Sequence, residues 1–314
     1  IEIVGLSMGT TYKVVAVDHS NALKIKAVEG AVETALREVN NSLSNWDESS
    51  EISRFNVQRA GLATSPSRDL AVVMQAAHDV NLASDGRFDT TIGPLIELWG
   101  FGAQGATSMP TTEEIVLARS KSSHANTLRF GAGKLEKTQD DAQIYLAAIG
   151  KGYGADRVGQ ALESFGLTDY MVEIGGDLYT SGRNPDGVAW QIGIETPNAA
   201  DRGVMGVIGV SGKGLASSGD YRNYFEKDGT RYSHLIDPVT GRPITHKTAS
   251  ATVIAENAML ADAWATAMLI LGRERGLEIA AREGVAVQFV DRNAPSSATR
   301  FETHASEAFK ALAA

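Results

Sequence analysis

Two oxygen-bearing side chains, Asp262 and Thr266, stand four residues apart in the apolar segment Ala258–Leu271. On a helix this spacing places both side chains on one face. A carboxylate is almost never fully buried without a partner, and a carboxylate beside a hydroxyl offers the hard oxygen ligands that suit Mg²⁺. The alternative is that Asp262 only caps the helix, but Asn257 already fills that role well. The pair therefore predicts a Mg²⁺ site with positions left for water and phosphate oxygens.

A glycine-rich segment, Ala147–Asp156, contains Gly150, Gly152 and Gly154 around Lys151. We expect a turn from a strand into a helix, where backbone N–H groups and the positive end of the helix suit a phosphate. The segment is not a P-loop, because the spacing GxxxxGK[ST] is absent. The alternative is a tight connection that carries a solvated lysine.

A possible proton carrier stands in the segment Tyr232–Pro243. His234 is suited to proton transfer near neutral pH, and Asp237 precedes a proline in a turn at the end of a strand. The alternative for His234 is a cross-strand histidine whose hydrogen bonds are satisfied by its neighbours.

Two further segments have the composition of a ligand pocket. Gly86–Leu95, followed by Leu98–Gly102, mixes aromatic and small residues with an acid and includes Phe88 and Asp89. The loop around Trp46 offers an indole that can stack on a flat ring. The alternatives are an apolar loop that covers the core and a tryptophan that plugs it.

Composition and charge narrow the classes of ligand. The chain has 314 residues, 43% hydrophobic and 21% charged, which is ordinary for a globular protein. The absence of cysteine excludes disulfides, zinc–thiolate sites and thiol chemistry. A net charge of -9 without a run of Lys and Arg argues against nucleic-acid binding. A metal ion would have to offset this charge if the ligand is a phosphate.

We expect no membrane span, because no apolar stretch approaches the roughly 20 residues that a span needs, and we predict no signal peptide from the pattern of the given sequence. The chain begins with Ile1 rather than Met, so we expect a processed or trimmed product. That expectation is compatible with the loss of a targeting segment or lipid anchor.

Helical and strand patterns alternate irregularly along the chain, which favours one α+β domain over residues 1–314, with mixed sheets and flanking helices. We predict helices from helical spacing and capping signals at Ala22–Leu43, Asp69–Ala83, Thr111–Ser120, Gly154–Phe165, Ala258–Leu271 and Arg275–Arg282. We predict strands at Thr11–Asp18, Tyr170–Ile174, Trp190–Glu195, Val204–Val210, Ser250–Ala255 and, as the last central strand, Val285–Val290. Gly212–Gly219 is interpreted as punctuation between elements.

Taken in order, these segments resemble the ApbE family, the FAD:protein FMN transferases. The matching motifs span about residues 5 to 290 and are MGTTY, LSNWDESSEISRFN, FDTTIGPLIELWGFG, AAIGKGYGAD, VEIGGDLYTSG, SHLIDPVTGRPI and ADAWATA. Each is weak alone, but seven motifs in the family's order make coincidence implausible. The resemblance implies an α+β fold with a T-fold-like core and a cleft for FAD.

The resemblance also implies roles for individual residues. Mg²⁺ would bridge the FAD phosphates and be held by Asp262, Thr266 and the backbone carbonyl of Ala148. The positions that match FAD contacts or neighbouring segments are Met8, Trp46, Phe88, Asp89, Lys151 and Ile236, and His234 matches a histidine near the phosphates. One departure is Tyr145, which stands where family members often carry an Asp that contacts FAD; a tyrosine supplies no carboxylate.

We therefore hypothesise a Mg²⁺-dependent transfer of FMN from FAD to a Ser or Thr hydroxyl of another protein, with AMP as the leaving group. Mg²⁺, Lys151 and backbone N–H groups of the glycine-rich turn would stabilise the developing charge. His234, or else Asp237, would accept the hydroxyl proton.

Two rival functions remain open at this stage. An FAD pyrophosphatase would use the same site with water as the nucleophile. A non-catalytic flavin-binding protein would not need Asp262 and Thr266 as metal ligands. The resemblance further suggests acceptor flavoprotein subunits of membrane redox complexes and a periplasmic, envelope-anchored location.

Overall fold

The computed structural model describes residues 1–20, 22–101, 109–198, 203–221, 224–227, 230–292 and 301–313. Gly102, the last residue of the predicted pocket segment, lies outside this range. Within the described residues, no helix is long and apolar enough to cross a membrane.

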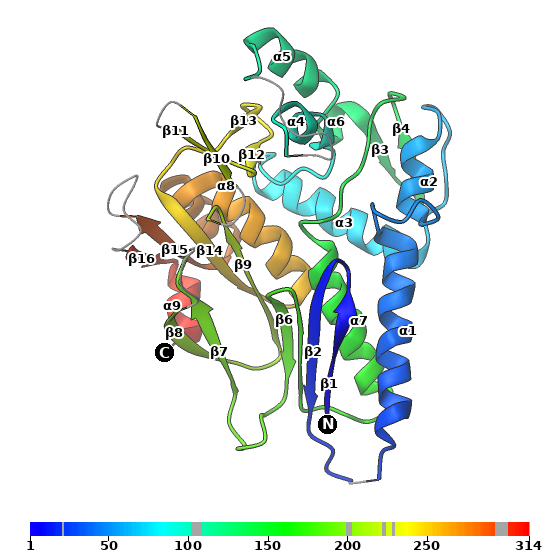
Figure 1. The fold of residues 1–314 in the computed structure, drawn as a ribbon, viewed down its shortest axis with the longest axis vertical. Helices are drawn as coiled ribbons and strands as arrows, with labels where there is room; N and C mark the ends of the chain where they lie inside the picture. Colours follow the sequence, from blue (N-terminus) through cyan, green and yellow to red (C-terminus); the bar gives the residue numbers. More distant parts are fainter. Residues whose placement is uncertain are drawn as a thin grey trace.

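An antiparallel sheet organises the chain (Figure 1). Its strand order, β1-β2-β5-β6-β9-β14-β15-β16, follows the order of the chain, and the pairs β2–β5 and β9–β14 join strands that are far apart in the sequence. The bounds are Glu2–Ser7 (β1), Thr10–Ala16 (β2), Tyr170–Ile174 (β5), Asp177–Ser181 (β6), Lys213–Gly219 (β9), Thr248–Ala255 (β14), Ala286–Arg292 (β15) and Phe301–Ala305 (β16).

Both faces of this sheet are covered. Helices α1 (Ile25–Leu43), α7 (Gly150–Glu163) and α8 (Ala258–Glu283) pack on one face. The opposite face packs against the hairpin β7 (Trp190–Glu195) and β8 (Val204–Val210) and against α9 (Glu307–Ala313). Central strand β14 is consequently buried along nearly its whole length, rather than alternating between core and solvent.

The remaining elements form a second layer at one end of the sheet (Figure 1). Apart from α3, they are short. Their bounds are Glu51–Val57 (α2), Arg68–Ala83 (α3), Gly93–Leu98 (α4), Thr112–Ser120 (α5), His124–Thr127 (α6), Leu128–Gly131 (β3), Lys134–Lys137 (β4), Tyr224–Lys227 (β10), Thr230–Ser233 (β11), Ile236–Asp237 (β12) and Arg242–Pro243 (β13).

Helix α8 is the centre of the core. It begins at the cap that was predicted, because the Asn257 side chain accepts a hydrogen bond from the Leu260 N–H group. It breaks at Gly272, whose φ of 69° is not helical, and ends at Gly284 in the left-handed conformation. The two separately predicted helices are thus confirmed as two halves of one broken helix.

The glycine-rich segment differs from its prediction. No strand precedes it, and helix α7 starts at Gly150 rather than Gly154, so its glycines lie inside the helix. A Cβ atom at Gly152 would lie 2.2 Å from the Ala258 carbonyl oxygen. These glycines therefore let α7 and α8 approach closely, which the turn interpretation did not anticipate.

Val285–Val290, predicted as the last central strand, is confirmed as β15, and β16 follows it and pairs with it antiparallel at the sheet edge. One interpretation needs correction. Gly212–Gly219, interpreted as punctuation, is mostly the central strand β9, whose small residues allow α8 to lie close above it. The capping box of Thr111 and Glu114 was predicted and is confirmed.

We predict that Gly214→Ala destabilises the protein. A Cβ atom at this β9 position would lie 2.3 Å from backbone atoms of Asn257, which cannot move without displacing the start of α8. Overpacking of this kind costs roughly 1–3 kcal/mol of unfolding free energy, measured by denaturant unfolding.

The matched control is Gly30→Ala at an exposed position of α1, where nothing lies within 4 Å of the added atom. It should stabilise by about 0.5–1 kcal/mol through helix propensity. Equal stability of the two variants would show that β9 and α8 are less tightly packed than described.

Candidate active site

One cavity of about 470 Å³ gathers residues from distant segments of the chain, between Arg87 and Ile270. It lies where α7 and α8 meet the second layer of short elements. Nine of its lining residues were singled out from the sequence: Phe88, Asp89, Tyr145, Ala148, Lys151, His234, Ile236, Asp262 and Thr266. This convergence makes it the candidate active site.

Asp262 and Thr266 face the cavity from one side of α8, as the helical spacing predicted. Asp262 is only 4% exposed, and its Oδ2 atom accepts a hydrogen bond of 3.1 Å from the Gly152 N–H group. The Thr266 hydroxyl lies 3.2 Å from the Ser218 hydroxyl on β9. The pair therefore sits on a rigid part of the core, with Asp262 tied to the first turn of α7.

Backbone N–H groups of the glycine-rich segment are partly used within the protein. The Gly150 N–H group donates to the Leu146 carbonyl at 2.8 Å, and the Gly152 N–H group donates to Asp262. We expected the N–H groups of this segment to bind phosphate. These two donate to protein groups instead, and the Gly152 N–H group in the first turn of α7 orients the Asp262 carboxylate.

Lys151 lies between two carboxylates. Its Nζ atom is 2.7 Å from Asp177 Oδ2 and 3.6 Å from Asp262 Oδ2. Burial alone would lower the pKa of Lys151, but Asp262 and Asp177 outweigh this effect and raise it, so the amine is an ammonium at neutral pH. Burial, reinforced by the Asp262 charge, raises the pKa of Asp177 above its usual range, and the Lys151 ammonium opposes this shift because it favours the charged carboxylate.

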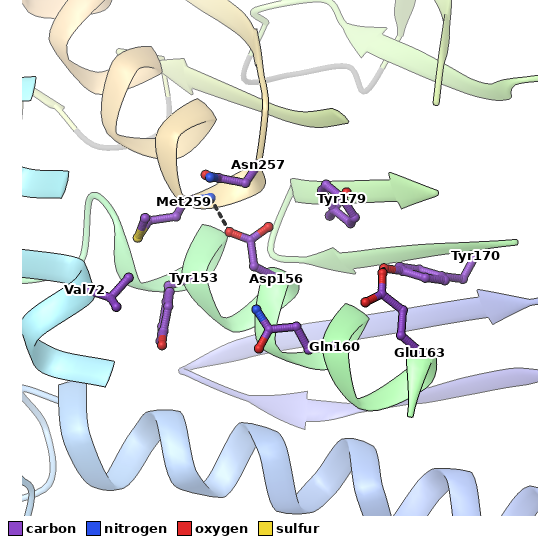
Figure 2. Close-up of a pocket in the computed structure, with 9 residues that line it drawn as sticks. All are labelled: Val72, Tyr153, Asp156, Gln160, Glu163, Tyr170, Tyr179, Asn257 and Met259. Carbon is purple, nitrogen blue, oxygen red and sulfur yellow. Dashed lines mark hydrogen bonds between the residues drawn. The ribbon is translucent and has the colours of Figure 1, made fainter. Parts of the chain in front are cut away.

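A carboxylate on α7 fixes the relative position of the two helices. Figure 2 shows Asp156 pointing at the start of α8, with a hydrogen bond to Met259. Its two oxygens accept from the Ala258 and Met259 N–H groups at 2.8 and 2.9 Å. Asp156 thus supplies a second N-terminal cap to α8, and the same contact holds Lys151 on α7 opposite Asp262 on α8.

The small cavity in Figure 2, about 260 Å³, borders this contact. It is lined by Val72, Tyr153, Asp156, Gln160, Glu163, Tyr170, Tyr179, Asn257 and Met259. None of the site residues predicted from the sequence lines it, so it is separate from the candidate active site.

The two candidate bases occupy different cavities. His234 lines the candidate active site, where its ring lies edge-on to Phe101 at 6.4 Å between centroids. Asp237 instead lines a neighbouring cavity of about 520 Å³. Its Oδ1 atom accepts from the Val239 N–H group at 2.9 Å and lies 3.4 Å from Arg87 Nε. The arrangement favours His234 over Asp237 as a proton acceptor in the larger cavity.

The Phe88–Asp89 segment lines the cavity as part of a rigid loop. Asp89 Oδ1 accepts from the Thr91 N–H and hydroxyl groups at 2.7 and 2.6 Å, and Oδ2 accepts from the His124 N–H group at 3.1 Å. Phe88 is buried and its N–H group donates to Ser84. The Asp89 carboxylate is therefore committed to shaping the loop, and the ring of Phe88 supplies apolar contact.

Tyr145, which departs from the family pattern, has a defined place. Its hydroxyl donates to Gln143 Oε1 at 2.9 Å, and its backbone N–H group donates to Thr90. A Cβ atom at Gly93 would lie 2.2 Å from the Tyr145 ring, so a glycine there makes room for the aromatic side chain. The phenol thus forms part of the wall without supplying a carboxylate.

Two predicted ligand contacts lie outside the cavity lining. Met8, in the β1–β2 turn, packs near the glycines of α7 and would collide with a side chain at Gly154. Trp46 is 90% exposed, so it does not plug the core, while its neighbour Asn45 is hydrogen-bonded to Ile144 and Leu146 on both sides of Tyr145. The roles assigned to Met8 and Trp46 stay predictions.

Polar residues of the cavity that sequence reasoning missed include Asp177, Ser218 and Arg87. Asp177 stands in the motif VEIGGDLYTSG, which contributes to the family resemblance, but the resemblance implied no role for any residue of this motif. Ser218 lies in the segment interpreted as punctuation. The acid at the start of a strand, directly after two glycines, was the signal that could have identified Asp177.

The donor atoms suit a hard divalent cation. Within the described residues, no cluster of three or more His, Cys, Asp or Glu side chains could hold a metal. The cavity instead offers the Asp262 carboxylate, the Thr266 hydroxyl and residue Ala148, whose carbonyl is an oxygen donor. Such a set with few protein ligands fits Mg²⁺, which usually completes its shell with water and substrate phosphates.

Comparisons with known proteins agree with this picture. The ApbE family model matches residues 8–289. An FAD:protein FMN transferase of Vibrio cholerae is 36% identical over 99% of this chain and 92% of its own length, and one of Escherichia coli K12 is 34% identical over 98% and 88%.

Solved structures give the same result. The flavin transferase ApbE from Vibrio cholerae superposes with a TM-score of 0.89 at 35% identity, covering 99% of this chain and 98% of its own. The flavinyl transferase ApbE of Pseudomonas stutzeri, in its apo form, gives 0.89 at 37% identity, covering 100% and 96%. These matches confirm the predicted α+β fold, and the chain belongs to the ApbE family.

Proposed function

We infer that this chain, a flavin transferase of the ApbE family, uses Mg²⁺ to transfer FMN from FAD to a Ser or Thr hydroxyl of an acceptor protein. The observation that carries the inference is the single cavity that combines the Asp262–Thr266 pair, Lys151 and His234. The relatives are FAD:protein FMN transferases, which supports the same reaction.

The bonds that change follow from the two substrates. The acceptor oxygen forms a bond to the phosphorus nearer the flavin, and the bond from that phosphorus to the bridging oxygen breaks, so that AMP leaves. When bound, Mg²⁺ offsets the negative charge that develops on the phosphoryl and leaving oxygens. Asp262, Thr266 and the Ala148 carbonyl would hold it.

The other residues of the cavity supply binding and proton transfer. The Lys151 ammonium adds positive charge beside the metal pair. His234 accepts the proton of the acceptor hydroxyl, and Asp237 is the second candidate. The apolar wall of Phe88, Ile236 and Ile270 suits a flat, largely apolar ring system.

The acceptor and location belong to the same proposal. The acceptors would be flavoprotein subunits of membrane redox complexes, and the protein would work in the periplasm, tethered to the envelope. The Ser/Thr hydroxyl as nucleophile is what separates this enzyme from an FAD pyrophosphatase and from a flavin carrier.

We expect covalent flavin on the acceptor only when FAD and Mg²⁺ are both present. Mass spectrometry of a candidate acceptor subunit should reveal one added FMN, and an acceptor with its target Ser or Thr replaced by Ala is the control. Rapid release of free FMN and AMP without acceptor would favour the pyrophosphatase. Binding of FAD with neither product would favour the flavin carrier.

We predict that Asp262→Ala lowers FMN transfer at least 100-fold and abolishes Mg²⁺ retention. The variant loses the only carboxylate of the proposed ligand set. Glu274→Ala is the matched control, because Glu274 is an exposed acid on the far half of α8 that pairs with Arg273 outside the cavity. Full transfer activity in Asp262→Ala would exclude the metal assignment.

We predict that His234→Ala slows transfer roughly 100- to 10,000-fold, the usual range for a lost general base, while the FAD dissociation constant changes little. Asp237→Asn, in the neighbouring cavity, should have a much smaller effect on kcat. The reverse order of the two effects, measured at saturating FAD and acceptor, would assign proton transfer to Asp237.

A further inference from the structure

A buried acid that the proposed mechanism does not use stands opposite the metal pair. Asp177 begins β6, directly after Gly175 and Gly176, whose φ values of 58° and 99° form the turn from β5. The residue is only 4% exposed and lines the candidate active site. An acid held at this depth needs a charged partner.

The charged partner of Asp177 within hydrogen-bonding distance is Lys151. Their 2.7 Å contact has the geometry of an ion pair rather than of a well-directed hydrogen bond. The same ammonium is 3.6 Å from Asp262, so two carboxylates compete for one cation. Asp177 holds the nearer position, which keeps Lys151 from closing fully on Asp262.

The competition matters because a metal ion and the Lys151 ammonium both favour the Asp262 carboxylate. If Lys151 paired closely with Asp262, a divalent cation would have to displace it before binding. An ammonium anchored on Asp177 leaves Asp262 available and stays beside the metal, where a pyrophosphate would meet both positive charges.

We propose that Asp177 is a positioning residue that draws Lys151 away from Asp262, and thereby keeps Asp262 free for the divalent cation that the dinucleotide's pyrophosphate requires. This inference rests on the proposed function, because it takes Asp262 as a metal ligand. It assigns Asp177 no contact with the reacting atoms.

The test is Asp177→Asn, which keeps the shape of the side chain and removes its charge. Lys151 should then pair with Asp262, so the dissociation constant for Mg²⁺, measured calorimetrically in the presence of ADP, should rise 10- to 100-fold, as is typical when a partner of a metal ligand is lost. The Mg²⁺ concentration for half-maximal transfer should rise in parallel, while kcat at saturating Mg²⁺ changes less. Asp177→Ser, which also removes the charge in a smaller side chain, should show the same shift if the Asn variant folds poorly.

A double-mutant cycle separates positioning from a general structural role. In a Lys151→Gln background the competing cation is gone, so adding Asp177→Asn should change Mg²⁺ affinity no further. Additive losses in the cycle would overturn the inference, because Asp177 would then act independently of Lys151.

Asp291→Asn is the matched control, because it removes another buried carboxylate, paired with Arg273, that does not line the cavity. It should lower thermal stability and leave the Mg²⁺ dissociation constant unchanged. An unaltered Mg²⁺ affinity in Asp177→Asn overturns this inference alone. Mg²⁺-independent transfer by the wild-type protein would instead overturn the metal role in the proposed function.

Discussion

The close contact between the first turns of α7 and α8 is the constraint on which the site depends. Three features make it: the missing side chain of Gly152, the Asp156 carboxylate that caps α8, and the Gly152 N–H group that donates to Asp262. Each crosses from one helix to the other. Together they fix the distance between a lysine and an acid that lie 111 positions apart in sequence.

The rest of the fold supports this contact from both sides. Strand β9 lies close beneath α8 because its residues are small, and the β5–β6 turn brings Asp177 to the same place. The second layer then closes the cavity with His234 and the Phe88–Asp89 loop. Since β2 pairs with β5 and β9 pairs with β14 across long intervening segments, the site forms only when distant segments have paired. We therefore expect the site to appear with the global fold rather than before it.

The sequence could predict features that depend on local spacing. The helical face shared by Asp262 and Thr266, the Asn257 cap and the ends at Gly272 and Gly284 are all set by neighbouring residues, and the structure agrees with each of them. The family resemblance, which needs only the order of motifs, was also correct.

Features set by tertiary contact could not be predicted. The glycines of α7 have the composition of a turn, and only the nearby α8 backbone explains why they lie in a helix. Strand β9 lacks a β-branched pattern, and its small residues let α8 pack closely against it. The pairing of Asp177 with Lys151 joins residues from two motifs, and nothing within either motif indicates it.

The acids of the site differ in how far their carboxylate oxygens are already hydrogen-bonded, and therefore in their remaining capacity to bind a ligand. Asp156 and Asp89 each direct both oxygens at groups of the protein, so they hold backbone in place and have little capacity for a ligand. Asp177 is bound to a lysine side chain, which can move, and Asp262 gives one oxygen to a single N–H group. The carboxylates bound by backbone therefore build the cavity. Those held by weaker or mobile partners, Asp177 and Asp262, are the two whose surroundings can respond when a cation and a dinucleotide enter.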